Sequence, residues 1–177
     1  MKTLLTLIAL MSLLSFLLKG SFHSRWGVAL AAFALTLAAG LSVPWLIRQS
    51  PAAFTAWTSS PEHLFDGAVC VVLEVLVMGV FCFGRVAKRW HFLRLYPGLL
   101  AFPTVIWLWA QALYARPGVN FSLFAWLAAG VTLAAAWGGP MLLRCLLPDE
   151  SSRLEALFLI NLFLLLLAVA ATGAITF

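Results

Sequence analysis

Glu74 is the residue in this sequence best placed to do chemistry. It is the one acidic residue well inside a long apolar run, DGAVCVVLEVLVMGVFCFG, eight residues after Asp66. A charge buried in a membrane is costly, so this carboxyl group must be protonated, be paired, or face water or protein. The functional interpretation is a proton or cation site. The structural alternative is a hydrogen bond to Gln111 or Asn161, and the sequence leaves both open.

A second set of polar and aromatic residues lies in the apolar run 95–115. Its members are Thr104, Trp107, Gln111 and Tyr114. Steps of three, four and three residues place them along one face of a helix. Such a stripe could line a solute path or contact Glu74, although aromatic residues near Arg116 also fit the belt at a membrane surface. Asn161, in the last apolar run, is of a type that more often joins helices than binds a substrate.

The chain lacks the residue patterns that other kinds of functional site would need. The three histidines fall in loops, which argues against a haem held between spans, and the three cysteines show no metal-ligand spacing. No phosphate-binding, dinucleotide-binding or hydrolase motif occurs. We therefore expect no catalytic residue, no metal and no cofactor. An enzyme acting on lipid head groups, with His91 in a basic loop, remains an alternative.

Composition identifies the class of protein. Of the 177 residues, 64% are hydrophobic and 10% are charged, and the mean hydropathy is +1.05, far above that of a soluble domain. The net charge of +5 does not indicate nucleic acid, because the basic residues sit between apolar runs without forming a stripe. We therefore expect the protein to be embedded in a lipid bilayer.

The elements that would position Glu74 are six predicted transmembrane helices in one all-α domain, 1–177. A bilayer core about 30 Å thick needs roughly 20 apolar residues. The runs that qualify or come close are 3–18, 26–47, 67–84, 95–115, 121–143 and 154–177. The first run is similar to a secretory signal, but Lys19 closes it at once and no A-x-A site follows, so we expect it to be retained.

Basic residues predict the orientation in a cell inner membrane. The loops between Lys19 and Arg25, Arg85 and Arg94, and Arg144 and Arg153 hold eight Lys or Arg, against three on the opposite side. The positive-inside rule places these loops in the cytoplasm and both termini outside it.

Two connections carry local signals. The loop from Arg48 to Asp66 contains spaced aromatic residues, which predict a short helix at the membrane surface. Before the last span, Ser152 and Glu155 match the pattern of a capping box, which predicts that the helix begins there.

Residues 36–48, TLAAGLSVPWLIR, are similar to residues 132–144, TLAAAWGGPMLLR, with seven of thirteen positions identical. If this similarity reflects a repeat, the halves are 1–94 and 95–177, each with three spans. An odd number of spans inverts the second half, as in many secondary transporters. The paired helix interruptions would be Pro44 and the run Gly138, Gly139 and Pro140. Biased composition is the alternative explanation.

These patterns favour transport of an ion or small solute, or a membrane subunit of a larger transport or ion-driven complex. The alternative from another class is a scaffold that binds partner subunits. Other membrane subunits or a homo-oligomer are the expected partners in either case, and nucleic acid is not.

Overall fold

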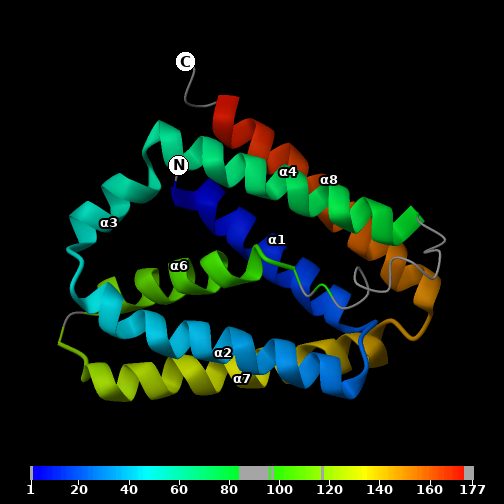
Figure 1. Cartoon of the computed structure of the whole chain (residues 1–177), viewed down its shortest axis with the longest axis horizontal. Coiled ribbons are helices and arrows are strands. Elements are labelled where there is room, and N and C mark those ends of the chain that lie inside the picture. Colours follow the sequence, from blue (N-terminus) through cyan, green and yellow to red (C-terminus); the bar gives the residue numbers. More distant parts are fainter. Residues whose placement is uncertain (1, 84–95, 97, 117, 174–177) are drawn as a thin grey trace.

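The computed structural model describes residues 2–83, 96, 98–116 and 118–173. Within them the chain is helical and contains no strand (Figure 1). The helices are α1 (Lys2–Gly20), α2 (Arg25–Ile47), α3 (Pro51–Thr58), α4 (Pro61–Phe83), α6 (Ala101–Tyr114), α7 (Phe121–Leu146) and α8 (Glu150–Gly173).

Five of these helices, α1, α2, α4, α7 and α8, are long and apolar enough to cross a membrane. This supports a multi-pass helical membrane protein. The fourth predicted span is different, because α6 has only 14 residues. At 1.5 Å per residue such a helix extends about 21 Å, less than a bilayer core. The prediction of a full-length helix over 95–115 is therefore wrong.

Two helix pairs form the sides of the bundle. α2 packs along α7 and α4 packs along α8, while α1 lies between them and contacts α6, α7 and α8 (Figure 1). Small residues allow a close approach in the first pair: a Cβ on Gly40 would lie 3.7 Å from Cβ of Ala129. In membranes, where lipid competes equally for apolar surface, small residues at such contacts let van der Waals packing hold helices together.

The outer faces of the bundle carry large apolar side chains, as expected for contact with lipid. The most exposed of them on α2, α7 and α8 include Trp26, Leu30, Leu41, Leu123, Trp126, Leu142, Leu159 and Val169. Inside, alanines of α2, α6 and α7 pack with Leu35, Val43 and Leu46.

Helix boundaries differ from prediction in two places. α4 begins at Pro61, six residues before the predicted span, so the connection after the short helix α3 is brief. α8 begins at Glu150, and the amide of Arg153 already bonds the carbonyl of Asp149 at 3.2 Å. Ser152 and Glu155 are thus inside the helix, and the predicted capping box is wrong. The predicted cytoplasmic loop 85–94, with His91, lies outside the described residues.

Candidate functional site

Glu74 lies near the middle of α4 and is buried, with 5% of its surface exposed. Its carboxylate accepts a hydrogen bond from the hydroxyl of Tyr96 and another, 3.2 Å long, from the backbone amide of Leu99. Both donors belong to the segment that leads into α6. Glu74 is thus in contact with protein. The backbone amide of Leu100 also contributes to the surroundings of this carboxyl. No bond to Glu74 from Gln111 or Asn161 is found among the described residues.

Gly98 makes this close contact possible. Its φ of +100° is a backbone conformation that glycine adopts without steric cost. A Cβ at this position would lie 2.9 Å from Oε1 of Glu74. Both the turn and the approach of the carboxylate therefore require the missing side chain.

α6 begins directly after this turn, beside Glu74, which lies near the middle of α4. Chain crossings that are interrupted within a membrane are tolerated where the freed backbone groups find partners in protein. The bond from Leu99 to Glu74 is one such contact. The carboxylate also lies beside the positive end of the α6 dipole, which favours a negative charge there.

A buried cation belongs to the same region. Lys19, in the last turn of α1, is 1% exposed, and its Nζ lies 2.7 Å from the ring centroid of Phe81 on α4. Its charge acts on the carboxyl of Glu74. The positively charged group thus meets an aromatic face and the field of an acid, two favourable surroundings for an ammonium group in a membrane.

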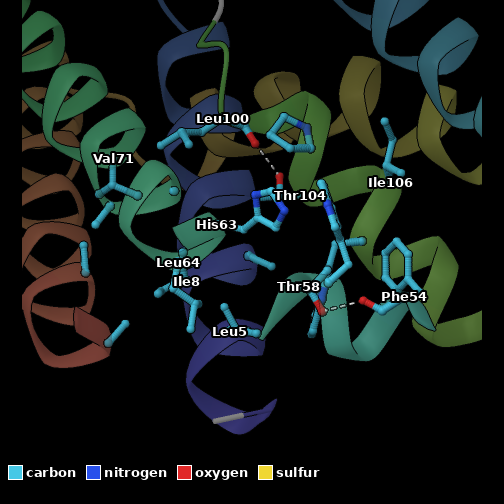
Figure 2. A pocket seen from close by; sticks show the side chains of 18 of the residues that line it. Leu5, Ile8, Phe54, Thr58, His63, Leu64, Val71, Leu100, Thr104 and Ile106 are labelled. Carbon is cyan, nitrogen blue, oxygen red and sulfur yellow. Dashed lines mark hydrogen bonds between the residues drawn. The ribbon is translucent and has the colours of Figure 1, made fainter. Parts of the chain in front are cut away.

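A cavity of 370 Å³ lies between α1, α3, α4, α6, α8 and the end of α2 (Figure 2). Thr104 and Trp107 of the predicted stripe line it, so half of that stripe faces a hollow. Val71 and Leu100 also line it. They lie next to the Glu74 contacts, because Val71 is one turn before Glu74 on α4 and Leu100 follows Leu99.

The other two residues of the stripe are not among the residues that line this cavity. Tyr114 donates its hydroxyl hydrogen to the carbonyl of Leu46, 3.1 Å away, and so joins the ends of α6 and α2. Gln111 is half-buried on α6. The four residues thus do not form one continuous lining.

Asn161 is buried in α8 and donates to Oγ of Ser15 on α1 at 2.9 Å and to the carbonyl of Leu157 at 2.8 Å. The first of these bonds joins two spans. Among the described residues, no hydrogen bond is found between Asn161 and Glu74.

The residues predicted to interrupt helices differ in how closely they pack against other helices. Pro140 is buried in α7 against α1, where a Cβ on Gly20 would lie 2.9 Å from its Cγ. A Cβ on Gly139 would lie 2.8 Å from Leu17, so it too marks a close crossing with α1. Pro44 is exposed on α2, and a Cβ on Gly138 would meet open space. Neither α2 nor α7 ends at its proline.

Sequence reasoning missed Tyr96, Gly98 and Lys19 as parts of the site. Tyr96 and Gly98 stand in an irregular segment, where no helical spacing connects them to Glu74. Lys19 ends an apolar run and was therefore assigned to a loop. The nearest sequence signal was the Pro-Gly pair at 97 and 98, which is typical of a turn and contradicts a continuous helix over 95–115.

Comparison of the sequence and structure with protein-family models, curated proteins and solved structures finds no match. Within the described residues, no three His, Cys, Asp or Glu side chains gather as metal ligands. The site therefore consists of a buried acid on α4 that holds the irregular segment before α6, next to a largely apolar cavity. Such a group can take up or release a proton or stabilise a cation.

Proposed function

We propose that this protein moves a small solute across the membrane and that Glu74 couples this movement to a proton. The observation that carries the proposal is the contact of a buried carboxylate with the segment that leads into α6, next to residues that line a cavity. Acids inside membrane spans commonly belong to ion or proton pathways. Interrupted helices at mid-depth are typical of solute sites in secondary transporters.

Protonation of Glu74 would weaken the contacts that hold the segment before α6 against α4. The ionised carboxylate attracts the hydroxyl of Tyr96, the amide of Leu99 and the positive end of α6. Neutralising it weakens all three attractions and leaves the charge of Lys19 without its compensating acid. We propose that the segment then loosens from α4. Because Leu100 lines the cavity, this movement would change the shape of the cavity.

We further propose that the chain crosses the membrane six times as two inverted halves, with α6 and the segment before it making the fourth crossing. The pairing of helices supports this proposal. α2 contacts α7, α4 contacts α8, and α1 contacts α6, so each helix touches its counterpart in the other half. Counterparts meet in this way when they surround a pseudo-two-fold axis in the membrane plane.

The test is proton movement in liposomes that contain the purified protein and an internal pH-sensitive dye. Solutes of several classes, including organic cations, amino acids and metal ions, are added outside. We expect at least one class to change the internal pH with the wild-type protein. Glu74→Gln, which keeps the shape of the side chain but cannot titrate, should abolish this change.

The matched control is Glu155→Gln, because Glu155 is an exposed acid on α8. It should behave as the wild type does. Correct assembly of Glu74→Gln is checked by its elution in size-exclusion chromatography. If a well-assembled Glu74→Gln protein moves protons as fast as the wild type, or if no solute class moves protons, Glu74 is a structural residue and the proposal is wrong.

A further inference from the structure

The cavity described above is lined by apolar and aromatic side chains. Four of its lining residues are aromatic: Trp45, Phe54, Trp57 and Trp107. Most of the other lining residues are aliphatic, including Ile8, Leu64, Val71, Leu100 and Ile106 (Figure 2). A volume of 370 Å³ falls within the range of about 300–1,000 Å³ that is typical of small-molecule sites.

The two hydroxyl groups in the lining donate to their own helices. Oγ1 of Thr58 bonds the carbonyl of Phe54 at 3.0 Å, and Oγ1 of Thr104 bonds the carbonyl of Leu100 at 2.8 Å (Figure 2). These bonds occupy both hydroxyl hydrogens of the lining, whereas the buried indole N–H of Trp107 has no hydrogen-bond partner among the described residues. A ligand would therefore be held by apolar and aromatic contact rather than by several hydrogen bonds.

Two acidic residues flank one of the lining residues on α4. None of the described lining residues is Lys or Arg. Glu62 and Asp66 are exposed on the first turns of α4, on either side of the lining residue His63. The ring of His63 lies 4.5 Å from that of Trp57, and its Nδ1 lies 3.9 Å from the carboxylate of Asp66. In sequence, two basic residues lie three positions from a lining residue: Lys2 before Leu5, and Arg48, which is exposed, after Trp45.

We propose that this cavity binds an apolar organic cation, a molecule whose positive charge is surrounded by hydrophobic groups. Aromatic faces attract such a charge through the ring quadrupole, and the apolar wall accommodates the hydrophobic groups. The two carboxylates at the start of α4 favour approach of a cation over an anion. The inference names the solute class of the proposed transport and rests on that proposal.

The experiment compares two ions of nearly the same shape and opposite charge. Binding of radiolabelled tetraphenylphosphonium and of tetraphenylborate is measured by equilibrium dialysis on the purified protein in detergent, with protein-free micelles subtracted. We expect saturable binding of the cation. We expect the borate anion to bind roughly tenfold more weakly or not at all.

Two glycines of α4 supply matched variants. Gly67 lines the cavity and Gly79 does not, and a Cβ at either position would meet no atom within 4 Å. Gly67→Leu therefore extends a side chain into the hollow without an initial clash. Gly79→Leu brings the same gain in helix propensity at a site away from the cavity. We expect Gly67→Leu to weaken cation binding roughly tenfold and Gly79→Leu to leave it unchanged.

Equal binding of the cation and the anion would overturn the inference, and so would equal affinities of the Gly67→Leu and Gly79→Leu proteins. Because binding is measured without flux, its failure is separate from failure of the proposed function. If these binding results fail while Glu74→Gln still abolishes proton movement with another solute, only the solute class is wrong. If the cation binds as expected but Glu74→Gln moves protons normally, the site stands and the coupling role does not.

Discussion

The hydroxyl of Tyr96 donates a hydrogen bond to the carboxylate of Glu74, and this contact ties the start of α6 to the middle of α4. The two residues are 22 positions apart in the chain. Their bond holds an irregular segment against the buried face of α4. A buried acid thus stabilises the non-helical backbone that precedes α6.

Replacing Tyr96 with Phe tests the strength of this contact. The substitution keeps the ring but removes a donor to a charged group, which should lower the free energy of unfolding by about 1–3 kcal/mol. Chemical unfolding in detergent micelles measures the change. The control is Tyr114→Phe, which removes a hydroxyl that bonds an uncharged carbonyl at 3.1 Å. An equal or larger loss in the control would show that the charge on Glu74 adds nothing to the bond.

Gly98→Ala should disturb the same site from the backbone side. The new methyl group meets Oε1 of Glu74 at 2.9 Å, in a backbone conformation that alanine disfavours. We expect a loss of about 1–3 kcal/mol in unfolding free energy. The control Gly118→Ala separates backbone strain from the close contact with Glu74. The φ of Gly118 is +91°, but a Cβ there would meet nothing within 4 Å. Gly118→Ala should therefore cost less, and equal costs would show that the approach to Glu74 adds no penalty.

Long apolar runs allowed most of the bundle to be predicted. The predicted runs 26–47 and 121–143 correspond to α2 and α7, because about 20 apolar residues without an interrupting charge have few folds other than a span. The same criterion failed for 95–115. Hydropathy does not detect an irregular turn within an apolar run, so the helix that begins only at Ala101 was predicted to begin six residues earlier.

The candidate site was predictable only in part. Glu74 was identified because a lone acid in an apolar run is costly whatever surrounds it. Its partners were not identified, since a bond between residues far apart depends on how the helices pack. The similarity of segments 36–48 and 132–144 also did not mean that matched residues have the same structural role. Thr132 accepts a bond from the indole of Trp109, whereas Thr36 donates to a carbonyl of its own helix.

The paired arginines of these two segments should differ in their effect on stability. Nε of Arg144 donates to the carbonyl of Ser21 at 2.7 Å, and its guanidinium also bonds the carbonyl of His23. These contacts place a cation at the C-terminal end of α1, where the helix dipole favours one. Arg48 is exposed at the end of α2.

Arg144→Ala should therefore lower the unfolding free energy by about 1.5–3 kcal/mol, while Arg48→Ala should change it by less than about 0.5 kcal/mol. Thermal and chemical unfolding of the purified proteins measure both values. Similar losses in the two variants would mean that the bonds from Arg144 to the end of α1 contribute nothing beyond a surface charge.

Orientation in the membrane is the last prediction. Ser59 follows α3, and Ser151 lies in the first turn of α8, within the predicted cytoplasmic loop 144–153. Eight basic residues in the three predicted cytoplasmic loops, against three on the other side, place Ser59 outside and Ser151 inside. Each serine is changed to cysteine in a protein that lacks Cys70, Cys82 and Cys145, and intact cells are treated with a membrane-impermeant thiol reagent. Ser59→Cys should be modified in intact cells, and Ser151→Cys only after the membrane is opened. The reverse pattern would invert the orientation, because the basic loops would then lie outside the cytoplasm.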